Sequence, residues 1–134
     1  MLRVRSPLDD ETERCITEAM DCGFAVHRAL GPGFPESTYR NAFCLELAAQ
    51  KIPFECEKPF VVKYRDRPVS THRIDLIVRN RLIIELKAVR MLERIHESQL
   101  LSYLKVTQLP AGLLMNFGGA TLKEGIQRVV SRSV

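Results

Sequence analysis

One stretch of sequence decides the fold: HRIDLIVRNRLIIELK, residues 72–87. Two apolar runs rich in β-branched residues flank the polar break Arg79-Asn80-Arg81, and this pattern predicts a β-hairpin. If the turn centres on Asn80, residues whose numbers add up to 160 face each other, so Asp75 faces Glu85. The Cβ atoms of such a pair lie about 4.5–5.5 Å apart. The stretch therefore places two carboxylates side by side.

The two faces of this predicted hairpin differ in polarity. One face carries only apolar side chains and is predicted to be core: Ile74, Leu76, Val78, Leu82, Ile84 and Leu86. The other face carries Asp75, Glu85 and, two residues further along the strand, Lys87. This assignment depends on the register, because a slip of one residue would turn Asp75 toward the core.

Two like charges that face each other destabilise a sheet unless another group offsets them. A divalent cation held by Asp75 and Glu85 would do so, since Mg²⁺ prefers carboxylate and carbonyl oxygens. Lys87 could then position or activate a metal-bound water, or stabilise charge on a phosphate. The alternative is an ordinary salt-bridge cluster in which Lys87 bridges the two acids.

The composition is that of one globular domain spanning residues 1–134, with residues 1–10 as a loose lead-in. A net charge of +4 and a pI near 9.0 mildly favour an anionic partner, and nucleic acid is the commonest one. The four cysteines form no C-x-x-C pair, so neither a zinc site nor a disulfide is expected. No signal peptide and no run of roughly 20 apolar residues is evident, so we expect no membrane contact and a cytoplasmic location.

Periodicity and chain-breaking residues predict the order of the helices and strands. Asp9 or Asp10 caps a helix, and Gly31-Pro32-Gly33 ends it. The predicted helices are Glu11–Leu30, a second that follows the extended entry at residues 34–37 and runs to about Lys51, and Glu93–Thr107. The predicted strands are Phe54–Tyr64, Val69–Val78, Leu82–Val89 and Ala111–Phe117, followed by an element of undecided type at Leu122–Val130. This order predicts an α/β fold with a mixed sheet covered by helices.

Polar side chains on two predicted helices are further candidates. Glu36 and Tyr39 lie three residues apart at a helix start and share a face, although the helix dipole alone would favour Glu36 there. On the helix near the C-terminus, Gln99 and Tyr103 belong to a polar stripe. They either project over the metal site and contact water or phosphate, or they form a partly exposed helix face.

Two residues next to Asp75 have separate interpretations. Arg73 shares the face of Asp75, where it either binds phosphate or pairs with Asp75 and Glu85. His72 shares the alternation of the core face, so we interpret it as a packing or capping residue.

Three spaced motifs occur in one order along the chain: Gly33-x-x-Glu36-x-x-Tyr39, Asp75-x9-Glu85-x-Lys87 and Gln99-x3-Tyr103. Together with segments 83–89, 96–105 and 113–118, they resemble the GxxExxY protein family of the PD-(D/E)XK nuclease superfamily. The resemblance runs from about Met20 to Val130. One departure is His72, where the family usually has an aromatic residue before the Arg of its Arg-x-Asp segment.

The resemblance implies a restriction-endonuclease-like αβββαβ core, here with an extra N-terminal helix, and Mg²⁺- or Mn²⁺-dependent hydrolysis of phosphodiester bonds. It also implies that Asp75, Glu85 and the main-chain carbonyl of Leu86 are metal ligands. The catalytic roles expected from it fall on Glu36, Asp75, Glu85, Lys87 and Gln99. Substrate contacts are expected for Arg73, Tyr39 and Tyr103.

Two functions follow as hypotheses. The first is a metal-dependent nuclease acting on nucleic acid, with DNA favoured. The alternative is a non-catalytic nucleic-acid-binding or interaction module on a nuclease fold. Because nothing in the sequence resembles a helicase or specificity domain, targeting would come from a homo-oligomer or from a larger repair or defence assembly.

Overall fold

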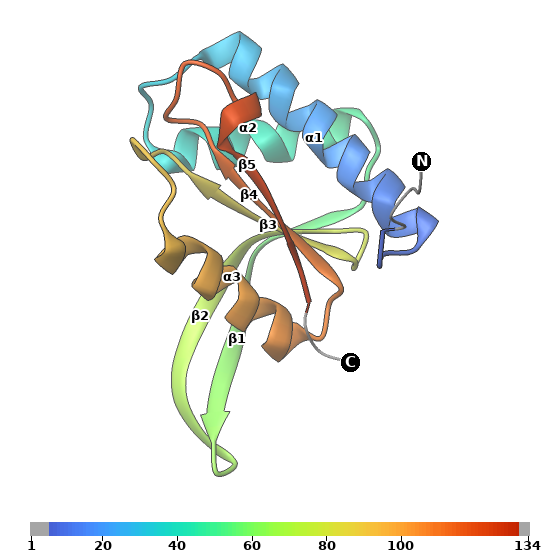
Figure 1. The fold of residues 1–134 in the computed structure, drawn as a ribbon, viewed down its shortest axis with the longest axis vertical. Coiled ribbons are helices and arrows are strands. Elements are labelled where there is room, and N and C mark those ends of the chain that lie inside the picture. Colours follow the sequence, from blue (N-terminus) through green and yellow to red (C-terminus); the bar gives the residue numbers. More distant parts are fainter. Residues whose placement is uncertain (1–5, 132–134) are drawn as a thin grey trace, which may run out of the picture.

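A computed structural model of the chain describes residues 6–131. The strands form one sheet, and helices cover both of its sides (Figure 1). Their order is α1 (Asp10–Leu30), α2 (Glu36–Ala49), β1 (Phe54–Tyr64), β2 (Arg67–Val78), β3 (Leu82–Lys87), α3 (Arg94–Thr107), β4 (Ala111–Asn116), the 3₁₀ turn η1 (Lys123–Gly125) and β5 (Ile126–Val130). The predicted α/β fold with an αβββαβ core and an extra N-terminal helix is confirmed.

Helix α1 begins where a side chain satisfies its first free N–H groups. The Asp9 carboxylate accepts a hydrogen bond from the Thr12 N–H at 2.8 Å, as an N-cap does. Gly31, with φ of 67°, ends the helix. The predicted lead-in is therefore too long, because Asp10 already belongs to α1, and its residues 1–5 lie outside the described part of the chain.

The sheet has the strand order β1-β2-β3-β4-β5 and is mixed. Strands β3 and β4 are parallel, with α3 as their connection, and the other neighbouring pairs are antiparallel. The predicted hairpin register is confirmed, since Leu76 pairs with Ile84 and Val78 with Leu82 around Asn80. The element of undecided type resolves into η1 and β5.

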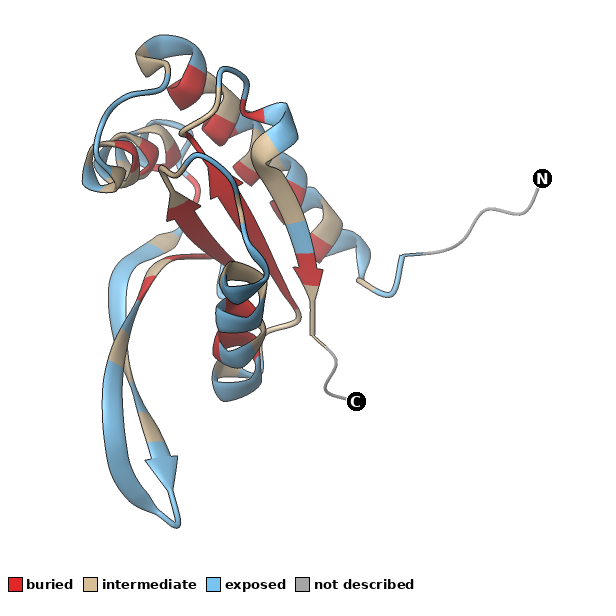
Figure 2. Ribbon diagram, turned by 60° about the vertical axis from the view of Figure 1, so that its left-hand side comes forward, coloured by how far each residue is buried: buried red, intermediate tan, exposed pale blue. Residues whose placement is uncertain are grey.

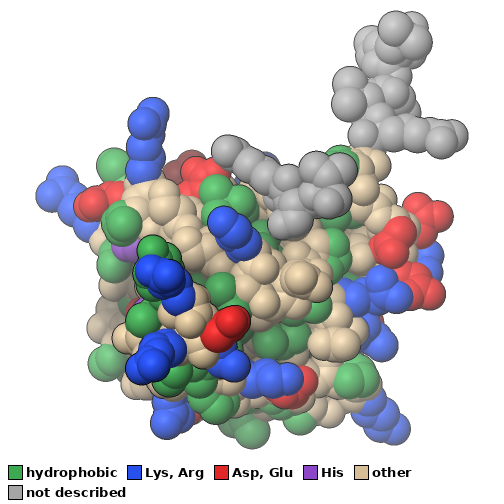
Figure 3. All heavy atoms as spheres, turned by 90° about the horizontal axis from the view of Figure 1, so that it is seen from below, with side chains coloured by type: hydrophobic (Ala, Val, Ile, Leu, Met, Phe, Trp, Pro, Cys, Tyr) green, Lys and Arg blue, Asp and Glu red, His purple; other side chains and the backbone are tan. Residues whose placement is uncertain are grey.

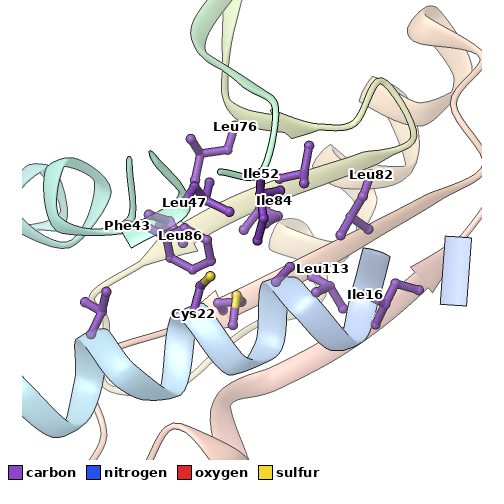
Figure 4. Close-up of a cluster of buried hydrophobic side chains, with 14 of the residues drawn as sticks. Ile16, Cys22, Phe43, Leu47, Ile52, Leu76, Leu82, Ile84, Leu86 and Leu113 are labelled. Atoms are coloured by element: carbon purple, nitrogen blue, oxygen red, sulfur yellow. The ribbon is translucent and has the colours of Figure 1, made fainter. Parts of the chain in front are cut away.

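Two apolar clusters lie on opposite faces of the sheet. The larger one is covered by α1 and α2 (Figure 4), and its side chains include Ile16, Phe43, Leu47, Leu76, Ile84, Leu86 and Leu113. The smaller one is covered by α3 and includes Ile77, Ile83, Leu100, Leu104 and Leu114. Both faces of β3 are therefore buried, as expected for a strand inside a layered α/β fold.

One predicted core position lies on the other side of the sheet. Ile74 packs in the smaller cluster with Ile77, although Leu76 and Val78 pack in the larger one. Strict alternation would place Ile74 with Leu76. The hairpin changes direction between them, where Glu57 of β1 has a φ of +51° opposite Asp75. The expected single core face therefore ends at Asp75.

Beyond this bend, β1 and β2 continue as a two-stranded ribbon that projects from the sheet (Figure 1). Its side chains are largely exposed, in contrast to the buried strands behind it (Figure 2). We call residues 58–73 the arm. Its turn holds Arg65 and Asp66 at positive φ, 51° and 63°, as tight hairpin turns require.

The cysteines are free thiols. Burial is the main cause that raises the pKa of Cys15 and of Cys22 to about 11 in each case, so both thiols stay protonated at neutral pH. Among the helices of residues 6–131, the structure contains none that is long and apolar enough to cross a membrane.

Candidate metal and phosphate site

Asp75 and Glu85 meet where the ladder between β2 and β3 stops. The paired residues of this ladder are Leu76–Ile84, Ile77–Ile83 and Val78–Leu82. At the next position, Asp75 and Glu85, the side-chain carboxylates accept hydrogen bonds from backbone N–H groups in place of a strand-to-strand pair. The Asp75 N–H donates to Glu85 Oε2 at 3.2 Å, and the Leu86 N–H donates to Asp75 Oδ2 at 2.9 Å. Each acid is thus held by the backbone of the opposite strand.

The Glu85 carboxyl is nearly enclosed, with only 4% of the residue exposed. Burial raises its pKa most, and the adjacent Asp75 carboxyl raises it further. These effects exceed the lowering by the Asp75 N–H and by Lys87, so the pKa of Glu85 lies well above its usual range. Without a cation, the pair therefore favours a proton on Glu85.

The backbone of Leu86 faces the same two carboxylates. Lys87 O accepts a hydrogen bond from Phe117 N–H at 2.7 Å, so this peptide group faces β4. The N–H and C=O groups of successive strand residues alternate between the two neighbouring strands. Leu86 therefore directs its N–H and its C=O toward β2, and the N–H reaches Asp75.

Lys87 and Gln99 come together from β3 and α3. Lys87 Nζ donates to Gln99 Oε1 at 3.4 Å, across the edge of the site. The start of α3 is fixed by a reciprocal cap in which the Glu93 N–H donates to His96 Nδ1 at 2.9 Å and the Glu93 side chain accepts from the His96 backbone. His96 is thereby engaged in capping, and Gln99, one turn later, is the residue of α3 that reaches Lys87.

Glu36 and Arg40 approach the acids from α2. Burial, followed by the charge of Asp75, raises the pKa of Glu36 against the lowering effects of Lys87 and Arg40. Arg40 Nη1 lies 3.7 Å from Asp75 Oδ1, and its Nη2 lies 3.3 Å from Glu57 Oε1. Arg40 was not among the predicted site residues, although its spacing of four residues from Glu36 places both on one helix face.

The two tyrosines have different surroundings. The Tyr103 ring packs edge-on against Phe60 at 5.0 Å and lies near His72 at 6.0 Å. Burial raises the Tyr103 pKa most, and the charges of Glu85 and Asp75 raise it further. The interpretation of His72 as a packing residue is confirmed by its ring contacts with Phe60 and Tyr103.

Tyr39 is fully buried and stacks on Phe117 at 4.8 Å. Its hydroxyl donates to Gly31 O at 2.6 Å and accepts from Phe34 N–H at 3.1 Å. This burial corrects the expectation that Tyr39 contacts substrate, because neither the ring nor the hydroxyl is open to a ligand. Its hydroxyl instead closes the turn between α1 and α2.

The donor set fits one hard divalent cation. Within residues 6–131 no group of three or more His, Cys, Asp or Glu side chains could hold a metal ion. Mg²⁺ is usually bound by one or two carboxylates, completed by waters and substrate phosphates. Asp75 and Glu85 supply two carboxylates, and the Leu86 carbonyl supplies a further oxygen of the kind that Mg²⁺ prefers. The hollow of about 1020 Å³ between α1 and the Arg79–Arg81 turn contains none of these groups.

Comparison with known proteins gives one match. A family model described as the PD-(D/E)XK nuclease superfamily matches residues 13–129, which include every site residue named above. The searches of curated proteins and of solved structures each return no match.

Proposed function

Since this chain belongs to the PD-(D/E)XK nuclease superfamily, we propose that it is a metal-dependent nuclease that hydrolyses phosphodiester bonds, with DNA as the favoured substrate. The observation that carries the proposal is the pair Asp75 and Glu85, held side by side at the end of the β2–β3 ladder with Lys87 next to them. Members of the superfamily are generally nucleases, and they typically use divalent metals.

Each site residue has a role in this proposal. Asp75, Glu85 and the Leu86 carbonyl would hold Mg²⁺ or Mn²⁺, and a bound metal would supply Lewis-acid stabilisation of the scissile phosphate and an acidified water. Lys87 orients that water or neutralises charge on the phosphate. Gln99 positions the Lys87 ammonium through the 3.4 Å hydrogen bond.

Three further residues complete the proposed site. Glu36, on α2, would contact a bound metal through water. Tyr103 and Arg73 contact the substrate from α3 and β2. In addition, Gly33-x-x-Glu36-x-x-Tyr39 supports membership of the GxxExxY family. A cytoplasmic location, a homo-oligomer and a place in a repair or defence assembly remain predictions.

The test is cleavage by the purified full chain, with labelled single- and double-stranded DNA and RNA in Mg²⁺, Mn²⁺ or chelator. We expect Lys87→Ala and Asp75→Ala to lower the cleavage rate by about 10²- to 10⁴-fold. Lys105→Ala is the matched control, because Lys105 is exposed on α3 and has no assigned role. Equal rates for the wild type and Lys87→Ala on every substrate would overturn the catalytic proposal.

One observation favours the non-catalytic alternative. Arg40 already places a cation 3.7 Å from Asp75, and the raised pKa of Glu85 favours its neutral form, so the acids are partly balanced without a metal. Calorimetric titration with Mn²⁺ separates the two functions. Absence of Mn²⁺ binding, together with retained DNA affinity in chelator, would favour the binding module.

A further inference from the structure

The arm carries the whole net charge of the chain. Residues 58–73 contain five cationic side chains and one Asp, which gives +4, and the remaining residues hold 15 Lys or Arg and 15 Asp or Glu. The five cations are Lys58, Lys63, Arg65, Arg67 and Arg73. A positive excess confined to one projecting element indicates that this element meets an anionic partner.

Most of these cations have no internal counter-charge. Lys58 pairs with Glu55 at 3.0 Å, but the other four form no ion pair within the described residues 6–131. By contrast, Arg79 and Arg81, at the opposite end of β2, are paired with carboxylates of α1 or its N-cap. Viewed from the arm's end, the molecule presents Lys and Arg side chains gathered over this region (Figure 3).

The arm also starts at the proposed site. Arg73 lies two residues from Asp75 on β2, a separation of about 7 Å along a strand. From Lys58 to Tyr64 the ribbon extends about 20 Å at about 3.3 Å per residue. A polymer of phosphates that reached Asp75 could therefore continue along the arm and meet its cations one after another.

The shape of the arm favours a duplex over a single strand. A two-stranded β-ribbon fits the major groove of B-form DNA, which is about 12 Å wide. Single strands are usually held by successive aromatic faces on which the bases stack. Within the fully described arm, Phe60 and His72 stack on each other at 5.5 Å and are covered by Tyr103, which leaves Tyr64, 70% exposed, as the open aromatic side chain.

We propose that the arm is a double-stranded DNA-binding element that lies in the major groove and directs the adjacent backbone to the Asp75–Glu85 site. Only the second part of this proposal, delivery of the backbone to the Asp75–Glu85 site, rests on the proposed nuclease function. A different role for the charges is to prevent the exposed edges of the hairpin from pairing with other chains, as Lys and Pro do on edge strands. The two roles differ in whether DNA affinity depends on the tip.

The experiment compares two triple variants of the full chain. Lys63→Gln/Arg65→Gln/Arg67→Gln removes the three cations of the tip, residues 63–67. Arg14→Gln/Arg28→Gln/Lys123→Gln removes the same charge from exposed positions on α1 and η1. Fluorescence anisotropy in chelator then measures affinity for a labelled DNA duplex, its separated strand and an RNA duplex of the same sequence, and circular dichroism compares the melting temperatures.

We expect the tip variant to lose duplex-DNA affinity on the order of 10- to 100-fold, and its salt slope to fall by about 2.7, which is about 0.9 per lost phosphate contact. The control variant should lose less than about threefold, because charges far from the groove act only through a screened field. The wild type should bind the separated strand and the RNA duplex more weakly than the DNA duplex. The tip variant should lose less affinity for these two ligands than for the DNA duplex.

Three results would overturn the proposal: equal loss in both variants, unchanged binding with new aggregation of the tip variant, or an equal loss for the duplex and the separated strand. The outcome is independent of catalysis, because binding is measured without metal. Wild-type duplex affinity together with wild-type cleavage in the tip variant would reject the role of the arm and leave the nuclease function intact. Binding that depends on the tip, without cleavage in any metal, would support the role of the arm and reject the nuclease function.

Discussion

Arg40 of α2 reaches across the end of the sheet to Asp75 of β2, with Nη1 3.7 Å from Oδ1. The same guanidinium lies 3.3 Å from Glu57 of β1, which is at the bend in the hairpin. One cation thus connects a helix to both strands where the ladder ends. Its Nε is buried and has no hydrogen-bond partner within the described chain, so the guanidinium is held by its charge contacts.

Replacement of Arg40 should change metal affinity. A positive charge close to a ligand oxygen opposes a divalent cation. We therefore expect Arg40→Ala to bind Mn²⁺ about tenfold more tightly than the wild type, and Arg40→Lys to remain close to it. Isothermal titration calorimetry measures both. Weaker binding by Arg40→Ala would instead show that Arg40 mainly holds Asp75 in position.

Glu85 should make the metal-free protein less stable as the pH rises. The unfolded chain releases the Glu85 proton near the ordinary pKa of 4.5, whereas the folded protein keeps it to a well higher pH. Between these two values the folded state carries more protons, so its stability falls with increasing pH. Urea unfolding of Glu85→Gln should lack this decline. Glu124→Gln, an exposed control, should retain it; a decline of equal slope in Glu85→Gln would assign the effect to other groups.

Metal binding should release a proton. A carboxylate must be ionised before it coordinates a cation, and the raised pKa of Glu85 keeps that proton in place at neutral pH without metal. We expect about one proton released per Mn²⁺ bound at neutral pH, measured by calorimetry in buffers that differ in ionisation enthalpy. The apparent affinity should rise with pH. A heat independent of the buffer would argue against coordination by Glu85.

Tyr39→Phe should lower stability without affecting the site. The lost hydroxyl leaves the Phe34 N–H and the Gly31 carbonyl without their partner, at a cost of about 1–3 kcal/mol. Chemical denaturation should show this loss, while Mn²⁺ affinity stays within error. If cleavage or metal binding fell while stability did not, the substrate contact first expected for Tyr39 would regain support.

Much of the architecture follows from local sequence. The alternation of residues 72–87 predicted the hairpin and its register, and Asp9 and Gly31 mark the ends of α1. The bend did not follow, because nothing in the residue type of Glu57 signals a positive φ. The element β5 was undecided, since its five residues are too short for a clear period.

The site was predictable to the extent that it lies on the hairpin. Asp75, Glu85 and Lys87 follow from strand alternation alone. Arg40 did not, because a single Arg on a helix is usually a solvated surface residue. Tyr39 was placed wrongly because burial depends on packing against Phe117, which is distant in sequence.

The reciprocal bonds between Asp75, Glu85 and Leu86 also bear on the order in which the site assembles. These residues lie within eleven positions of one another, so closing the loop between them costs little chain entropy. The helix that brings Arg40 is distant in sequence from the hairpin, whereas Gln99 lies only 12 residues beyond Lys87. The two helices dock on opposite faces of the sheet. The acids therefore meet as soon as the hairpin closes, and they acquire Arg40 and Gln99 only when both helices have packed. Cation affinity during refolding would thus report on the hairpin, whereas the geometry around Lys87 would report on the finished fold.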